Sequence, residues 1–178
     1  IYGYNNVEIP TQLKGCLVVK GAEDKKHKMA NLVSEQLVGC GFNEIMNNSL
    51  TRGAYYEGHN AYPTENCVNI MNPLSNDLNV MRQSLLFGGL ESIEYNVKRQ
   101  NGNLRFFEFG NVYKFDPERK NADNPMAAYK EDFHLALWLT GKRVENSWAH
   151  ANEDSSYHEL DAYVKNILSR IGAQPGML

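Results

Sequence analysis

The sequence predicts an α+β domain in which an antiparallel sheet is flanked by helices. Strand-like and helix-like segments follow one another without the regular strand–helix alternation that is typical of a parallel α/β sheet. The 178 residues, of which 42% are apolar and 11% aromatic, suffice for one domain with a buried core. We therefore expect a single sheet-based module rather than two domains or a disordered chain.

Charge and composition exclude several classes of protein. The formal net charge is −3 and the sequence pI is about 6.0, whereas a dedicated nucleic-acid-binding domain is usually strongly basic. No apolar run approaches the roughly 18–20 residues of a membrane-spanning helix. The chain opens at Ile1 without a signal peptide, so we expect a piece of a longer protein. Its three cysteines (Cys16, Cys40 and Cys67) show no metal-ligand spacing, which favours a reducing, cytoplasmic compartment.

The N-terminal part of the chain reads as a tail, a linker and a helix. Residues 1–11 resemble the end of a preceding domain, and glycines punctuate a linker over 12–24. Asp24 is predicted to be the N-cap of an amphipathic helix that ends before Gly41. The apolar positions of this helix recur at helical spacing: Met29, Leu32, Val33, Gln36, Leu37 and Cys40.

The middle of the chain alternates short strands with two helical segments. Residues 42–50 are predicted to form a strand, 51–57 a short helix, and 68–71 a second strand. A longer helix is predicted over 83–100, with a buried stripe of Leu86, Leu90, Ile93 and Val97. The Gly88-Gly89 pair within it costs roughly 1 kcal/mol per residue relative to alanine. That cost is either simply tolerated or reflects close approach of another backbone.

Two long strands and a final helix complete the predicted module. Over 104–115, one strand face carries Phe107, Phe109, Tyr113 and Phe115 and is predicted to face the core. The alternate face carries Phe106, Glu108, Gly110, Val112 and Lys114 and is predicted to be a mixed surface. A polar loop over 116–130 is of the length that usually marks function or mobility. The strand over 133–140 is apolar on both faces, which predicts a central position in the sheet. Ser156 and Glu159 predict a capping box at the start of a helix that ends before Gly172.

The sequence shows none of the common motifs of catalysis or metal binding. Five histidines are present, but no H-E-x-x-H or comparable spacing occurs, so we expect no metal site. No P-loop, G-x-S-x-G or G-x-G-x-x-G motif is found. Cys40 lies on an apolar helix stripe, which favours a buried core position over a nucleophile.

Three segments closely resemble the β chain of bacterial phenylalanyl-tRNA synthetase. They are Asn72-Pro-Leu-Ser75, Met81-Arg-Gln-Ser-Leu-Leu86 and Phe107-Glu-Phe-Gly-Asn-Val-Tyr113. The opening Ile1–Asn6 resembles the end of the domain that precedes the catalytic-like module of that chain. Trp148 and the segment Tyr157–Asp161 match a later part of the module more loosely. The resemblance runs along essentially the whole sequence.

The resemblance implies a class II aminoacyl-tRNA synthetase core that has lost its chemistry. Residues 25–178 would form this catalytic-like module, truncated at its C-terminal end. The intact enzyme would be an (αβ)₂ heterotetramer whose α chain activates phenylalanine with ATP and Mg²⁺. Contacts to tRNA, editing and anticodon binding would belong to other parts of the full enzyme. No cofactor and no membrane contact are expected for this chain.

The resemblance also marks positions where catalytic residues would stand. Lys114 takes the place of an arginine that grips the ATP α-phosphate, and a lysine lacks the planar two-point fork. Leu135 and Leu137 stand where the catalytic subunits carry Gln and Glu that line the amino-acid pocket. With Asp116, these residues form the expected degenerate analogue of the active site. We therefore expect no catalytic residue in this chain.

The expected role is assembly with the α chain. The helix with Met29, Leu32, Val33 and Leu37 is the analogue of the first class II motif and is expected at the subunit interface. The same stripe could instead pack on the sheet of its own domain.

Two alternatives remain open at the level of the sequence. One is an active ATP-dependent ligase that uses Lys114, Glu108 and Asp116. The other is an RNA-contacting module that uses Lys25, Lys26, Lys28 and Arg119-Lys120, although the three N-terminal lysines also fit a solvated first turn of a helix.

Overall fold

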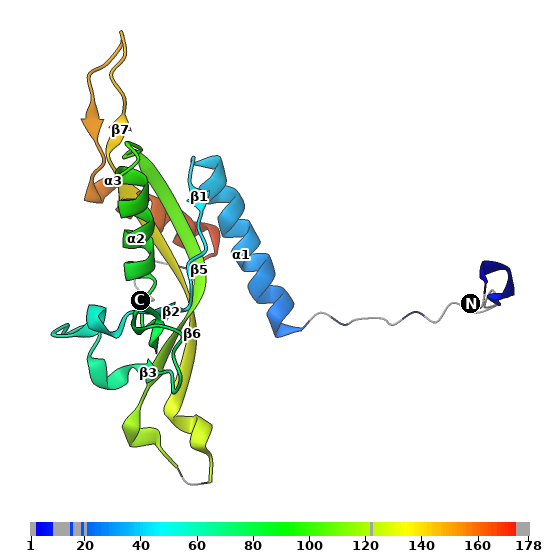
Figure 1. Cartoon of the computed structure of the whole chain (residues 1–178). Helices are drawn as coiled ribbons and strands as arrows, with labels where there is room; N and C mark the ends of the chain where they lie inside the picture. The colour runs from blue at the N-terminus through cyan, green and yellow to red at the C-terminus, as the bar shows by residue number, and fades with distance from the viewer. Residues whose placement is uncertain (1–2, 9–14, 16–18, 20, 122, 174–178) are drawn as a thin grey trace.

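The computed structural model describes residues 3–8, 15, 19, 21–121 and 123–173. Its main sheet has the strand order β1 (Asn43–Glu44), β5 (Leu104–Phe115) and β6 (Tyr129–Thr140) (Figure 1). The long strands β5 and β6 are antiparallel along their whole length, and the short β1 runs parallel to β5. The α+β prediction is confirmed, with one short parallel pair added to the antiparallel sheet.

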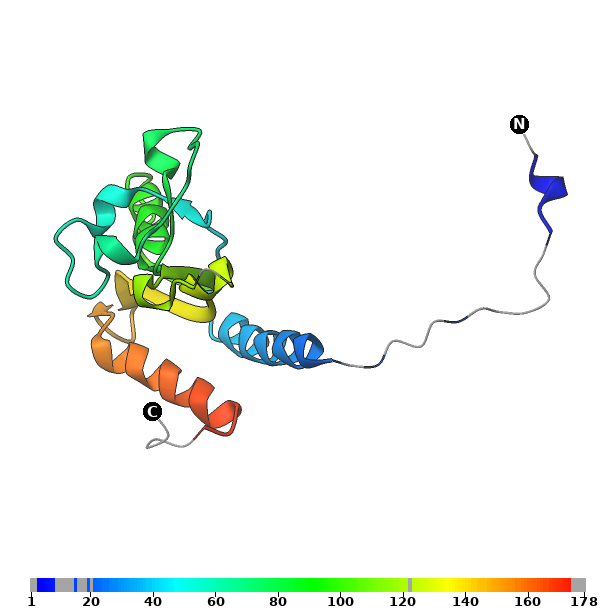
Figure 2. The ribbon, with the colours of Figure 1, turned by 90° about the horizontal axis from the view of Figure 1, so that it is seen from below.

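Helices cover both faces of this sheet. Helices α1 (Ala22–Gly39) and α3 (Tyr157–Arg170) lie on one face, and α2 (Leu86–Val97) lies on the other (Figure 2). Within the described residues, no helix combines the length and the apolarity needed to cross a membrane.

Two small antiparallel sheets complete the module. One has the order β2 (Leu50–Thr51), β4 (Val80–Met81) and β3 (Val68–Asn69). The other pairs β7 (Lys142–Val144) with β8 (Glu153–Asp154) in a hairpin. Short 3₁₀ turns occupy Gly53–Tyr56, Pro117–Arg119 and Pro125–Ala128, so the predicted short helix and the predicted polar loop are both found.

The two faces of β5 are both buried, which corrects the prediction of a mixed surface. Phe107 packs with Val33, Leu37, Phe42 and Ile167 beneath α1 and α3. The opposite face carries a second core cluster, composed of Leu85, Leu104, Phe106, Val112 and Trp138. Polar Glu108 lies on that second face and is only 1% exposed. The prediction was wrong because helix α2 covers this face.

The strand β6 lies at the edge of the described sheet, and β5 is central. The prediction of a central position for the strand over 133–140 was therefore wrong. Its two apolar faces have another cause, because Leu135 and Leu137 pack under α1 and α3 while Trp138 packs under α2. Helix cover on both faces makes an edge strand as apolar as a central one.

Two further boundaries differ from the sequence-based expectation. The predicted strand over 42–50 splits into β1 and β2, which belong to different sheets. Helix α1 begins at Ala22, so Asp24 is its third residue rather than its N-cap. Asp24 Oδ2 accepts a hydrogen bond of 2.6 Å from the backbone N–H of Gly21. Gly41 follows α1 with φ of 84°, as a helix-ending glycine requires.

Of the predicted apolar stripe of α2, Ile93 packs against the core cluster beneath the helix, whereas the other three members are exposed. Leu86, Leu90 and Val97 are 38%, 47% and 51% exposed. The helix faces the sheet with Gly89, where an added Cβ would lie 2.0 Å from the indole of Trp138. The glycine therefore permits a close approach, although the neighbour is an indole side chain rather than another backbone.

The predicted N-cap of α3 is confirmed. Ser156 Oγ accepts a hydrogen bond of 3.3 Å from the backbone N–H of Glu159. The Glu159 carboxylate pairs with Arg105 at 3.3 Å, so it does not complete the predicted capping box. Gly172 follows the helix with φ of 80°.

We expect the Ser156→Ala substitution to lower the free energy of unfolding by about 1 kcal/mol, because it removes this cap. The matched control is Ser155→Ala, whose hydroxyl makes no hydrogen bond to the part of the chain that the structure describes. Urea unfolding of both variants checks the prediction, and equal loss in the two would contradict it.

Half of the predicted tail (1–11) and linker (12–24) lies outside the described residues, and so does Cys16. The boundaries of these N-terminal segments stay predictions.

Candidate functional site

The four positions of the expected degenerate site do not converge on one cavity. In the register of β5 and β6, Lys114 lies opposite Lys130, whereas Leu135 lies opposite Phe109 and Leu137 opposite Phe107. Because side chains alternate along a strand, Lys114 and the two leucines lie on opposite faces of the sheet.

Leu135 and Leu137 are half-buried in apolar surroundings. Both pack against the cluster that contains Val33, Leu37 and Phe107. Apolar side chains in such a layer offer no donor or acceptor to an ammonium or carboxylate group. This face of the sheet supplies packing at the two positions.

Asp116 organises the turn that follows β5. Its Oδ1 accepts a hydrogen bond of 3.1 Å from the backbone N–H of Glu118, and its Oδ2 pairs with Arg119 at 3.3 Å. Its own backbone N–H donates to the carbonyl of Ala128 at 2.7 Å. The carboxylate is thus used as a local cap.

Glu108, a member of the alternative ligase site, is buried in an ion pair. Its Oε1 lies 2.6 Å from Nη1 of Arg82, and both side chains are more than nine-tenths buried. Its Oε2 accepts a hydrogen bond of 2.8 Å from Nδ2 of Asn47. At about 3.4 Å per residue, β5 places the Cα atoms of Glu108 and Lys114 roughly 20 Å apart. The structure therefore separates Glu108 from Lys114 and Asp116, which line one cavity at the end of β5.

Arg82 connects three separate segments of the chain. Its Nε donates to the carbonyl of Asn111 at 2.9 Å, and its Nη1 donates to the carbonyl of Asn47 at 3.3 Å. A Cβ on Gly110 would lie 2.2 Å from Nη2 of Arg82, so this glycine leaves the room that the guanidinium needs. The segments 81–86 and 107–113, which carry the family resemblance, thus interlock through one buried ion pair.

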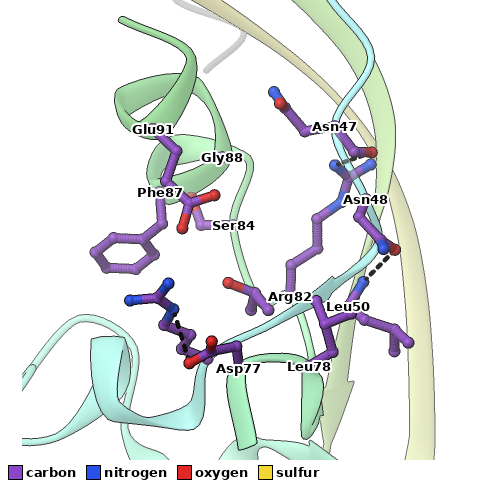
Figure 3. Close-up of a pocket in the computed structure, with 12 residues that line it drawn as sticks. Asn47, Asn48, Leu50, Asp77, Leu78, Arg82, Ser84, Phe87, Gly88 and Glu91 are labelled. Atoms are coloured by element: carbon purple, nitrogen blue, oxygen red, sulfur yellow. Dashed lines mark hydrogen bonds and ion pairs between the residues drawn. The ribbon is translucent and has the colours of Figure 1, made fainter. Parts of the chain in front are cut away.

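A pocket of about 160 Å³ opens beside this network, between the start of α2 and the segment 47–52 (Figure 3). Its lining consists of Asn47, Asn48, Leu50, Thr51, Arg52, Asp77, Leu78, Arg82, Ser84, Phe87, Gly88 and Glu91. The lining charges are already partnered, since Arg52 pairs with Asp77 at 3.2 Å and Glu91 accepts from the hydroxyl of Tyr55. This hydrogen bond to Glu91 raises the pKa of Tyr55. No lining residue is a histidine or a cysteine.

The Cys67 thiol and the possible metal-binding side chains also give no sign of a reactive site. Burial raises the pKa of the Cys67 thiol, which keeps it neutral and poorly nucleophilic. Within the described residues, no group of three His, Cys, Asp or Glu side chains is placed to hold a metal ion.

The predicted interface residues divide into two groups. Val33 and Leu37 are 3% and 1% exposed and belong to the core of this chain. Met29 is 53% exposed, and Leu32 is half-buried. Lys26, in the basic cluster at the start of α1, lies 4.2 Å over the ring of Phe133. Val33 and Leu37 therefore pack helix α1 onto the sheet of its own chain, whereas Met29 is exposed at the surface and Leu32 is half-buried.

Sequence reasoning missed the buried pairing of Arg82 with Glu108 and the buried Gln83. Gln83 is 1% exposed and donates from Nε2 to the carbonyl of Pro63 at 2.9 Å. The available signal was the carboxylate of Glu108 in the middle of a strand that is rich in aromatic residues. A charge in such a position usually has a partner elsewhere in the chain.

Comparison with known proteins gives one consistent family. The family model described as "Phenylalanyl tRNA synthetase beta chain CLM domain" matches residues 9–177. The phenylalanine–tRNA ligase beta subunit of Bacteroides fragilis is 64% identical over 172 residues, which is 97% of this chain and 21% of that protein. The corresponding subunit of Porphyromonas gingivalis is 49% identical over 99% of this chain and 22% of that protein. The chain thus spans about one fifth of the length of the curated relatives it matches.

Solved structures agree on the fold. An ATP phosphoribosyltransferase regulatory subunit/histidyl-tRNA synthetase from Bacillus halodurans aligns with a TM-score of 0.58 at 15% identity, covering 93% of this chain and 39% of that one. A pyrrolysyl tRNA synthetase from Desulfitobacterium hafniense aligns with a TM-score of 0.54 at 14% identity, covering 84% and 46%. The expected fold, that of a class II aminoacyl-tRNA synthetase core, is confirmed.

Proposed function

The chain belongs to the family of phenylalanyl tRNA synthetase beta chain CLM domains, and from this premise we propose that it is a non-catalytic assembly module of that enzyme. In this proposal the module pairs with the catalytic α chain of a cytoplasmic (αβ)₂ heterotetramer. It contributes to the charging of tRNA with phenylalanine by holding the enzyme together.

The observation that carries the proposal is the apolar packing of Leu135 and Leu137 against the core beneath α1 and α3. These are the positions at which the catalytic subunits are expected to bind the amino acid. Lys114 lies on the opposite face of the sheet, and Asp116 is used as a turn cap. An active site requires its groups to be held in one geometry, and these four residues are not.

The cofactors of the reaction belong, in this proposal, to the partner chain. ATP and Mg²⁺ bind to the α chain, and the residues of this module take no part in their chemistry. Recognition of tRNA bodies, editing and anticodon binding belong to other parts of the full enzyme. The domain organisation follows the same reasoning, with the catalytic-like module over 25–178 preceded by a linker and the tail of another domain.

The proposed contact with the α chain is the outer side of helix α1. Met29 is 53% exposed on this helix, and Leu32 is half-buried. Val33 and Leu37 hold the helix to its own sheet, so the exposed residues are presented on a rigid support. Apolar side chains on such a support are suited to the core of a stable interface.

Met29→Asp in the full-length β chain is expected to weaken assembly with the α chain about tenfold or more, because it places a charge in an apolar contact. The matched control is Met71→Asp, since Met71 is 93% exposed and lies outside α1. The mass of the complex, measured by light scattering over a concentration series, reports the change. Equal assembly of the two variants would contradict the assignment of this surface.

A further inference from the structure

The turn between α2 and β5 contains the only Asn-Gly pair of the sequence, Asn101-Gly102. The short side chain of an asparagine reaches the backbone of the residues that follow it. Glycine has no Cβ, so its backbone nitrogen is open to approach and its backbone adopts conformations that other residues avoid. The amide carbon of Asn101 and the backbone nitrogen of Gly102 are therefore a pair of groups that can react with each other.

Hydrogen bonds hold the chain on both sides of this pair. The backbone N–H of Asn101 donates to the carbonyl of Asn96 at 3.1 Å. The residue before it, Gln100, has φ of 63°, which is the left-handed conformation that ends many helices. On the other side, the hydroxyl of Thr140 donates to the carbonyl of Gly102 at 2.7 Å. The peptide bond between Asn101 and Gly102 lies between these two anchors.

The groups that would react have no partner among the residues that the structure describes. Asn101 is exposed, its side-chain amide makes no hydrogen bond to them, and neither does the backbone N–H of Gly102. A Cβ built on Gly102 would have no atom within 4 Å, so this side of the turn is open. Asn103, two residues on, accepts from the backbone N–H of Lys142 at 2.8 Å and donates to Glu145 at 2.8 Å. Of these two neighbouring asparagines, Asn101 is thus the one whose amide is free to react.

We propose that Asn101 is a site of spontaneous deamidation. Hydroxide takes the proton of the Gly102 backbone nitrogen, which attacks Cγ of Asn101. The new N–Cγ bond closes a five-membered succinimide ring, and the Cγ–Nδ2 bond breaks and releases ammonia. Water then opens the ring at one of its two carbonyl carbons and leaves either aspartate or isoaspartate. One water is consumed and one ammonia is released, so the reaction needs no oxidant, reductant or second protein.

The modification changes the chain where three elements are joined. Both products place a carboxylate where the neutral amide was, and isoaspartate also adds one carbon to the main chain between α2 and β5. Gly102 ties this segment to the end of β6 through Thr140, and Asn103 ties it to the β7–β8 hairpin through Lys142. This site goes beyond the proposed assembly function and does not depend on it.

Incubation of the assembled full-length enzyme over days tests the proposal. Trypsin cleaves after Arg99 and Arg105, so one peptide contains both Asn101 and Asn103, and fragment masses report the conversion of each. A sample digested at time zero corrects for conversion during digestion. We expect Asn101 to convert about tenfold or more faster than Asn103, because glycine rather than leucine follows it. We also expect the rate to rise in alkaline buffer, because the attacking nitrogen must lose its proton.

Gly102→Ala is the matched variant. Alanine fits the folded turn, because a Cβ there meets nothing within 4 Å and Gly102 is not in the left-handed conformation. The same Cβ crowds the attacking nitrogen, so we expect conversion at Asn101 to slow about tenfold while the urea unfolding midpoint is unchanged.

Two results would each refute the site. One is conversion of Asn101 no faster than that of Asn103 in the assembled enzyme. The other is a Gly102→Ala variant that converts at Asn101 as fast as the unsubstituted enzyme. Neither result bears on the assembly function, which has its own test.

Discussion

Replacing the buried Arg82 with methionine is expected to lower the free energy of unfolding by about 3–5 kcal/mol, because it leaves a buried carboxylate without its cation. Glu108 is 1% exposed, and its Oε1 lies 2.6 Å from Nη1 of Arg82. The substitution also removes the hydrogen bonds of Arg82 to the carbonyls of Asn47 and Asn111. Urea unfolding, followed by the fluorescence of the buried Trp138, measures the loss.

A second substitution separates the orphaned charge from the lost packing. In Arg82→Met/Glu108→Gln the buried group is neutral, and its amide oxygen can still accept from Asn47. We expect the double variant to recover at least about half of the stability that Arg82→Met loses. Glu94→Gln, which breaks the exposed pair of Glu94 with Lys98, is the matched control and is expected to change little. If Arg82→Met were as stable as this control, the buried ion pair would not be the feature that interlocks these segments.

Gly89→Ala is expected to cost about 2 kcal/mol or more, although alanine is the better helix former. Its Cβ would lie 2.0 Å from Cε2 and 2.1 Å from Cζ2 of Trp138, far inside any real contact distance. Trp138 is 7% exposed and packs in the core beneath α2, so its ring has little room to move. Either the helix or the indole must shift, and both movements disturb the core.

The control for Gly89 is another helical glycine. Gly39 lies in α1 with nothing within 4 Å of an added Cβ. Gly39→Ala is therefore expected to raise stability by about 0.5–1 kcal/mol. Combining Gly89→Ala with Trp138→Phe, which shortens the opposing ring system, is expected to restore part of the loss. Stabilisation by Gly89→Ala alone would refute the close packing of α2 on β6.

The long strands show what the sequence can and cannot predict. The bounds of β5 match the predicted strand over 104–115, because its dense aromatic alternation is a strong local signal. Its second face was read as surface, since Glu108 and Gly110 look polar or neutral in isolation. Their burial depends on Arg82, which is distant in sequence, and strand periodicity carries no information on such a partner.

The predictions of the buried side of α2 and of a central position for β6 were wrong for the same physical reason. Periodicity locates an apolar stripe on α2, of which Ile93 packs against the core. The close approach at Gly89 is explained only by the neighbouring Trp138, which periodicity cannot reveal. Two apolar faces on β6 were taken to mean a central strand, whereas helices cover both faces of an edge strand. Which element covers a face is a tertiary property.

The candidate site was predicted only in part. The motif residues Arg82 and Gly110 were located, and the structure gives them a structural role through one buried network. The positions Lys114, Leu135 and Leu137 were expected in one degenerate site, but strand parity places them on two faces of the sheet. The alternation of side chains could have assigned these residues to their faces only if the register between β5 and β6 had been known.

Phenylalanine-dependent exchange of pyrophosphate into ATP tests the central claim most directly. The full-length β chain that carries this module is measured alone, and then in complex with the α chain, at equal concentrations. The assembly account predicts exchange by the complex and none above background by the β chain. Exchange by the β chain alone, at a rate that follows its concentration, would contradict the account and make the module an active ligase.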